Sequence, residues 1–194
     1  EYTEVNMLSW EVLQTSVADC KKCSLSQFRI LPVLGEGNLN AGILFVGEGP
    51  GRNEDIQGRP FVGQAGKLLE EMLESIGLTR SDVYISNIVK CRPPNNRVPL
   101  PEEATMCLPY LRAQTALLKP KIIVCLGATA ATYIYDPNVR ITRDRGIWKE
   151  KKGVIIMPTF HPAALLRDSS RKAEAWADMQ TIKSLLLRLK TNSG

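Results

Sequence analysis

The sequence is poor in histidine, in aromatic residues and in long hydrophobic runs. His161 is the only histidine among 194 residues, and Phe, Trp and Tyr together make up 6%. No run approaches the roughly 18 apolar residues that span a membrane. The first ten residues, EYTEVNMLSW, have neither the basic start nor the apolar stretch of a signal peptide. We therefore expect a cytoplasmic protein with no membrane partner.

Two nucleotide-binding motifs are also missing. The segment Gly47–Gly51 reads GEGPG, but the chain has neither Gly-x-Gly-x-x-Gly nor the Gly-Lys-Ser/Thr of a triphosphate-binding loop. The carboxylates of Glu54 and Asp55 follow directly, and their charge would repel a phosphate. Phosphate binding is therefore the weaker alternative for this loop.

The same segment is nevertheless the centre around which the chain is organised. An apolar run, 43–46, has the length and composition of a buried strand, and the glycines after it impose a tight turn with free backbone amides. Arg59, Pro60 and Phe61 follow. Because ligands bind at the carboxyl ends of strands in open α/β sheets, we expect a site here.

Length and composition indicate one domain, residues 1–194. Hydrophobic residues make up 44%, which supports a sizeable core, and the net charge of +5 suits a polyanionic partner without proving one. Strands alternate with helices, so we predict an α/β fold with a mainly parallel sheet and helices on both faces. We expect strands at 31–34, 42–47, 83–89, 121–126, 147–150 and 153–157, and helices at 9–19, 63–76, 102–118, 127–134 and 171–190.

Four of the five cysteines are placed as ligands of a metal or an iron–sulfur cluster. Cys20 and Cys23 form a C-x-x-C, and Cys91 and Cys107 complete a set of four. Zinc, a redox pair and unrelated thiols are the alternatives, although a redox C-x-x-C would open a helix rather than follow one. Cys125 lies inside an apolar run and is expected to be a small core residue.

Four motifs in order, together with these cysteines, resemble the family 4 uracil-DNA glycosylases, the iron–sulfur enzymes typical of thermophilic archaea and bacteria. The motifs are GEGPG with Glu54-Asp55, Gly58-Arg59-Pro60-Phe61, the segment 87–93 (NIVKCRP) and the segment 161–166 (HPAALL). The resemblance implies a three-layer α/β/α sandwich with a four-stranded parallel sheet. It also implies a [4Fe-4S] cluster on Cys20, Cys23, Cys91 and Cys107, and hydrolysis of the N-glycosidic bond of uracil in DNA.

The resemblance assigns the base-binding roles to four positions. Phe61 would stack on a flipped base, Gly49 would lie beside it, and Asn87 would read the uracil edge, which cytosine cannot match because its donor and acceptor are reversed. His161 would donate to uracil O2 as negative charge develops there. Without the resemblance, Asn87 is as well explained by capping a turn, and a lone histidine by a structural or solvated position.

Three carboxylates are candidates for positioning the attacking water. Glu48 matches the acidic residue of the first motif, and Glu54 and Asp55 are second candidates. A solvated loop or a helix cap is the alternative for the last two. The residue types do not decide among the three.

The segment after His161 is expected to be a loop that enters the minor groove. Leu165 and Leu166 would fill the gap left by the flipped base, while Arg167 and Arg171 would hold phosphates. The alternative is that both leucines belong to the core.

Two other functions are compatible with parts of this pattern. One is a protein that binds or traps uracil-DNA with little turnover, and the other is an electron-transfer or nucleotide-binding module. We expect a monomer that acts at the nucleoid on uracil in double- and single-stranded DNA, with replication or repair proteins as further partners.

Overall fold

A computed structural model describes residues 9–192. The expectation that the chain starts without a signal peptide rests mainly on residues 1–8, which lie outside the described residues. No described helix is both long enough and apolar enough to cross a membrane.

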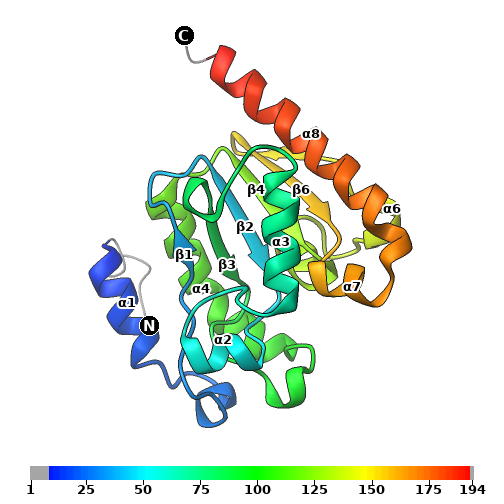
Figure 1. The fold of residues 1–194 in the computed structure, drawn as a ribbon. Coiled ribbons are helices and arrows are strands. Elements are labelled where there is room, and N and C mark those ends of the chain that lie inside the picture. Colours follow the sequence, from blue (N-terminus) through cyan, green and yellow to red (C-terminus); the bar gives the residue numbers. More distant parts are fainter. Residues whose placement is uncertain (1–8, 193–194) are drawn as a thin grey trace.

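One six-stranded sheet forms the centre, in the order β1-β3-β2-β4-β6-β5 (Figure 1). The four inner strands run parallel, as predicted, and a short antiparallel strand extends each edge. The strands are β1 Glu36–Gly37, β2 Ile43–Gly47, β3 Tyr84–Asn87, β4 Ile122–Leu126, β5 Lys149–Lys151 and β6 Val154–Thr159. The sheet is therefore larger than the predicted four-stranded one only at its edges.

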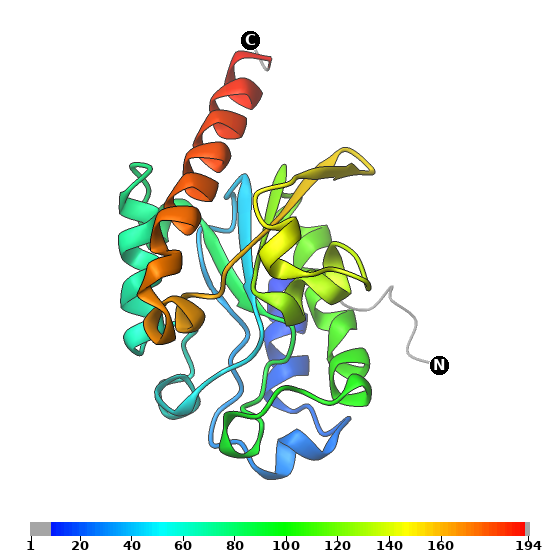
Figure 2. The same ribbon diagram turned by 90° about the vertical axis from the view of Figure 1, so that its right-hand side faces the viewer.

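Helices cover both faces of the sheet and complete three layers (Figure 2). One layer contains α1, α4 and α5, and the other contains α3, α7 and α8. The helices are α1 Trp10–Ala18, α2 Arg52–Gln57, α3 Gln64–Glu74, α4 Pro101–Leu118, α5 Ala128–Ile134, α6 Ile141–Asp144, α7 Pro162–Arg167 and α8 Lys172–Thr191. Short 3-10 helices lie at Ser24–Gln27, Arg80–Asp82, Pro94–Asn96 and Ser169–Arg171.

Strand β2 shows why the sequence builds this sandwich. Its residues are all buried, so it reads as a continuous apolar run rather than an alternating one. Leu44 and Val46 join the core on the α4 side, while Ile43 and Phe45 join the core on the α3 side. Successive side chains of a strand point to opposite faces, so one run supplies both layers.

Three local expectations are wrong. Residues 31–34 are not a strand, because the Leu31 amide bonds to the carbonyl of Asp55 and the Val33 amide to that of Lys90 rather than to a ladder. The residues after Gly51 form helix α2. The residues after His161 form helix α7, which has Pro162 in its first turn, where proline loses no hydrogen bond.

The strand order places the functional cleft. The chain leaves β2 to form β3 on one side of it and then crosses to form β4 on the other. In parallel sheets such a reversal of direction opens a crevice at the carboxyl ends of the strands. The loops after β2, β3, β4 and β6 meet at that edge.

Candidate active site

A broad cleft opens at the carboxyl ends of the inner strands. It is lined by the loop after β2, the start of α3, the end of β3 with the loop that follows it, the start of α5, and the segment from Phe160 to α7. Seven of the predicted residues line it: Glu48, Gly49, Glu54, Phe61, Asn87, His161 and Arg167. Asp55, Leu165, Leu166 and Arg171 are not among the lining residues.

Asn87 lies at the floor of the cleft, at the end of β3. The side chain is 2% exposed, and within the described residues its Oδ1 has no hydrogen-bond partner. Leaving a buried polar atom unpaired is costly, which points to a ligand that supplies the missing donor. A Cβ atom on Gly47 would lie 2.6 Å from this oxygen, so the glycine keeps the space beside it open.

Lys90 fixes the backbone behind Asn87. Its Nζ is buried and donates to the Asn87 carbonyl at 2.7 Å, to Ser86 Oγ at 2.6 Å and to Gln114 Oε1 at 2.7 Å. All three protons of the ammonium group are therefore used. The backbone of Asn87 is thus held by a hydrogen-bonded polar network beneath the cleft.

Phe61 and His161 form the aromatic wall. Their ring centroids are 5.5 Å apart and the planes differ by 28°. Phe61 is 5% exposed and has a φ of +52°, in the left-handed region that side chains other than glycine rarely adopt. The wall suits a flat ring bound against it.

The geometry defines the tautomer of His161. The residue caps α7, and its Nδ1 accepts a hydrogen bond from the Ala163 amide at 3.0 Å. A neutral imidazole that accepts at Nδ1 carries its proton on Nε2. Burial, together with a smaller effect of the nearby Arg167 charge, lowers the pKa of His161 to about 4. The ring is therefore a neutral donor at physiological pH.

The three candidate carboxylates have different surroundings. Glu48 is half-buried, and its Oε2 accepts from Thr129 Oγ1 at 2.6 Å. Glu54 Oε1 accepts from the Val62 amide at 3.3 Å. Asp55 is 1% exposed and accepts from the Ile30 amide at 2.8 Å, on the side of α2 away from the cleft lining. Asp55 therefore holds the 29–31 segment in place and does not line the cleft, which leaves Glu48 and Glu54 as the better-placed candidates.

The two leucines after His161 separate. Leu165 is fully buried in the core shared with α3, whereas Leu166 is 47% exposed. The helical turn of α7 explains the difference, because neighbouring residues on a helix face different directions. The prediction that Leu165 lies in a loop is wrong, and its burial leaves Leu166 as the leucine of this pair that is exposed to a partner.

The two arginines beyond the leucines also differ. Arg167 is exposed at the rim of the cleft. Arg171 donates to Glu174 Oε1 at 3.1 Å and lies over the Phe160 ring, 5.8 Å from its centroid. A phosphate would have to compete with Glu174 for Arg171, so Arg167 is the better-placed cation.

The four predicted ligand cysteines line one small hollow. Cys20 and Cys23 face it from the segment after α1, Cys107 from α4, and Cys91 from the loop between β3 and α4. Arg29 Nη1 donates to Cys91 Sγ at 3.1 Å, and the Lys90 amide donates to Cys107 Sγ at 3.3 Å. Among residues 9–192, no three His, Cys, Asp or Glu side chains meet at the geometry of a single metal ion.

Cys125 behaves differently from these four. It lies within β4, is fully buried in the α4-side core and is not part of the hollow. Burial raises the pKa of its thiol, as expected of an inert core cysteine.

Three functional candidates are missed by the sequence interpretation: Thr129, Lys90 and Arg80. Thr129 follows the end of β4, so its position at the sheet edge gave the available signal. Lys90 is part of the segment 87–93, but a lysine next to a proline-rich loop indicates solvent exposure. Arg80 has no local signal, because its partners lie 10 to 44 residues away.

The fold and the site together define an α/β protein with a cleft for a planar, hydrogen-bonding ring. A family model of the uracil DNA glycosylase superfamily matches residues 34–180. The chain is 48% identical over 190 residues to the type-4 uracil-DNA glycosylase of Sulfurisphaera tokodaii, covering 93% of this chain and 86% of that protein. It is 47% identical over 191 residues to that of Thermotoga maritima, covering 95% and 97%.

A more distant relative is the type-5 uracil-DNA glycosylase of Pyrobaculum aerophilum, which is 29% identical over 180 residues and covers 84% of this chain and 77% of that protein. These matches bear out the resemblance inferred from the motifs. The chain belongs to the type-4 uracil-DNA glycosylases of the uracil DNA glycosylase superfamily.

Proposed function

We propose that this protein flips uracil out of DNA and hydrolyses its N-glycosidic bond, leaving an abasic site. The observation that carries the proposal is the buried Asn87 Oδ1, which has no hydrogen-bond partner among residues 9–192, on the floor of a cleft whose wall is Phe61 and His161. Membership of the family makes uracil the expected base. We expect the chain to act as a monomer, at the nucleoid, on double- and single-stranded DNA.

Asn87 supplies the selection of uracil. Its Oδ1 accepts from uracil N3–H, which gives the unpaired oxygen a donor, and its amide donates to uracil O4. Cytosine presents a lone pair at N3 and an amino group at position 4, so both contacts become repulsive. Each buried unpaired group costs about 1–3 kcal/mol, so two mismatches are enough to reject cytosine.

His161 and Glu48 act on the two ends of the breaking bond. As the bond between the sugar C1′ and the base N1 breaks, its electron pair moves to the base, and the Nε2–H of His161 stabilises the negative charge at O2. Water adds to C1′ and its proton passes to a carboxylate or to solvent. Glu48 is the better-placed carboxylate because Thr129 orients it, and Glu54 is the second candidate.

The rim of the cleft supplies the contacts to DNA. Leu166 is the exposed apolar side chain that would fill the gap left by the base, and Arg167 is the neighbouring cation for a phosphate. Arg171 contributes less, since it is already paired with Glu174.

Cys20, Cys23, Cys91 and Cys107 would hold a [4Fe-4S] cluster. Each ligand of such a cluster binds a different iron, so four thiolates have to surround a space rather than meet at a point. The hollow between α1, α4 and the loop after β3 has that arrangement. The cluster supplies a structural cross-link between distant segments, and no step of the reaction depends on it.

The alternative, a protein that traps uracil-DNA without turnover, is less well supported. His161 follows β6 after a single residue, Phe160, so no inserted basic loop carries the histidine. A gel assay with uracil-containing oligonucleotide tests the proposal. Catalytic amounts of protein should convert excess substrate to abasic sites, whereas a stoichiometric covalent complex, or no excision, would contradict it.

A further inference from the structure

The residues that line the cleft do not explain the backbone conformation of Phe61. A φ of +52° is unfavourable for a phenylalanine, and this conformation persists only where surrounding contacts hold the backbone in place. The carbonyl of Phe61 approaches Gly66 so closely that any Cβ at position 66 would collide with it. The ring position therefore depends on what fixes this turn.

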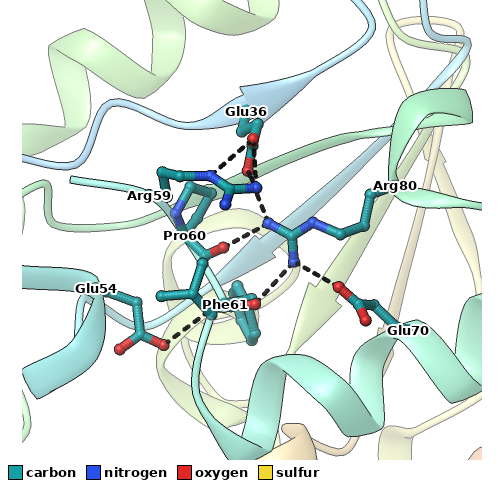
Figure 3. Close-up of polar contacts among 8 residues, drawn as sticks. Glu36, Glu54, Arg59, Pro60, Phe61, Glu70 and Arg80 are labelled. Carbon is teal, nitrogen blue, oxygen red and sulfur yellow. Dashed lines mark hydrogen bonds and ion pairs between the residues drawn. The ribbon is translucent and has the colours of Figure 1, made fainter. Parts of the chain in front are cut away.

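Arg80 grips the turn from outside the cleft (Figure 3). Its Nη1 donates to the Phe61 carbonyl at 2.8 Å, and its Nη2 donates to the Pro60 carbonyl at 2.6 Å. The guanidinium thus bonds both peptide oxygens at the strained residue. The guanidinium uses two nitrogens of one rigid plane for these bonds, which fixes the two peptides relative to each other more strictly than a flexible ammonium group would.

Two carboxylates hold the guanidinium in turn. Glu36, on edge strand β1, accepts from Arg80 Nη2 at 2.9 Å, and Glu70 on α3 lies 3.7 Å from Arg80 Nη1. The Arg80 side chain is only 17% exposed, so these interactions are partly shielded from water. Arg59 also binds Glu36, at 2.8 Å, but touches neither carbonyl.

We propose that Arg80 is a positioning residue for the base-stacking ring. It does not line the cleft, and it acts by holding the Pro60–Phe61 peptides so that the Phe61 ring stays against His161. The inference rests on the proposed role of Phe61 in stacking on uracil. If the inference holds, binding of the base depends on the charged network of Arg80, Glu36 and Glu70, which lies outside the cleft.

The test compares Arg80→Met with Arg59→Met, which removes the other arginine bound to Glu36 while the hydrogen bonds from Arg80 to the Pro60 and Phe61 carbonyls are kept. Inhibition by free uracil reports the pocket without base flipping, and single-turnover rates on single-stranded uracil-DNA report the reaction. Arg80→Met should weaken uracil inhibition about tenfold and slow excision by about ten- to a hundredfold, since small misplacements near the reacting group have effects of that order. Arg59→Met should change both by less than about twofold.

A double-mutant cycle separates positioning from general support of the fold. In a Phe61→Ala background, Arg80→Met should have almost no further effect, because the ring it positions is gone. Full additivity of the two changes, or an Arg80→Met protein with wild-type uracil inhibition, would overturn the inference. If Arg80→Met does not fold, the milder Glu36→Gln, which removes the charge of one of the two carboxylates that hold the guanidinium, takes its place in the same cycle.

The same experiment separates this inference from the function on which it rests. A wild-type protein that excises no uracil contradicts the proposed function. If the wild type is active and the Phe61→Ala variant is equally active, the stacking role and the Arg80 inference are both contradicted. If Phe61→Ala slows excision and weakens uracil inhibition but Arg80→Met changes neither, the Arg80 inference alone is contradicted.

Discussion

Thr129 Oγ1 donates a hydrogen bond of 2.6 Å to Glu48 Oε2 across the carboxyl edge of the sheet. The two residues are 81 positions apart: Glu48 lies in the loop after β2, and Thr129 lies in the first turn of α5, which follows the neighbouring strand β4. The bond fixes one carboxylate oxygen of a residue that lines the cleft. A carboxylate held on one side in this way has a defined direction in which to accept a proton from water.

The first prediction concerns this pair. Thr129→Val should slow uracil excision about tenfold, because a hydrogen bond to a charged group contributes about 1.5–3 kcal/mol. Glu48→Gln should slow excision more, because this variant loses the carboxylate that accepts the proton from water. Thr132→Val is the matched control, since the Thr132 hydroxyl bonds only to the Ala128 carbonyl of its own helix. Single-turnover rates on single-stranded substrate measure the effect, and equal rates for both threonine variants would remove Thr129 from the site.

The second prediction is that His161 stays neutral throughout the physiological range. Its pKa is lowered to about 4, so NMR of the only histidine should show a neutral Nε2–H tautomer down to that pH. The unfolded state gains this proton near pH 6.5 and the folded state does not, so the free energy of unfolding should fall as pH drops from 6.5 towards 4. Denaturation of wild type and His161→Gln over this window tests it, because the glutamine variant should lose that part of the pH dependence. A titration midpoint near 6.5 in the folded protein would contradict it.

His161 also has a predicted kinetic effect. His161→Ala should slow uracil excision by about 10²–10³, the usual cost of removing a preorganised donor to a developing anion. The factor should be similar on U·A duplex, U·G duplex and single strands, since the departing base is the same in each.

The third prediction concerns Asn87→Asp. A carboxylate cannot donate to uracil O4, so uracil excision should fall by about 10²-fold, because one buried hydrogen bond is replaced by a repulsive contact between two oxygens. A protonated carboxyl presents a donor and an acceptor in the arrangement that cytosine needs, so slow cytosine excision should appear at low pH. Asn138→Asp, at an exposed position away from the cleft, is the control. Unchanged single-turnover rates on uracil would exclude Asn87 from base recognition.

The fourth prediction separates the two adjacent leucines. Leu165→Ala should lower the free energy of unfolding by about 2–5 kcal/mol, as for other fully buried leucines. Leu166→Ala should change stability by less than about 0.5 kcal/mol but slow excision, most on U·A duplex, less on U·G and least on single strands. The order follows from the decreasing cost of extracting the base. Equal slowing on all three substrates would show that Leu166 is not a wedge.

The fifth prediction concerns the cysteines. Protein prepared without oxygen should be brown and contain iron, and Cys107→Ser should lose the colour and melt at a lower temperature. Cys125→Ser should keep both the colour and the iron, because Cys125 lies outside the hollow. Zinc without iron in the wild type, or loss of the cluster only in Cys125→Ser, would contradict the assignment.

Much of the architecture follows from local patterns. The buried runs at 43–46 and 122–126 and the amphipathic stripe of α3 identify their elements within one or two residues. Edge strand β1 could not be found in this way, because two residues, Glu36 and Gly37, carry no periodicity and pair with β3 only in the folded chain. Helix α7 was missed because six residues are too few to show a helical stripe.

The residues of the candidate site also fall into those that local patterns predict and those that they do not. Asn87, His161 and Glu48 follow strands, so their meeting at one edge could be predicted from the parallel sheet alone. The different positions of Glu54 and Asp55 depend on how α2 packs, and those of Leu165 and Leu166 on the direction of one helical turn. The direction in which each of these side chains points is decided by tertiary contacts. The sequence of two adjacent, chemically similar residues does not show which of them will be buried.

The close packing around Gly47 has a practical consequence. A single methyl group there would sit 2.6 Å from both Asn87 Oδ1 and the Phe61 Cζ, so one or both of these side chains would have to move from the positions proposed to bind the base. Gly47→Ala would thus deny entry to the base while leaving Leu166 and Arg167 unaltered. The protein could in this way be turned into a probe that still surveys DNA but no longer admits its target.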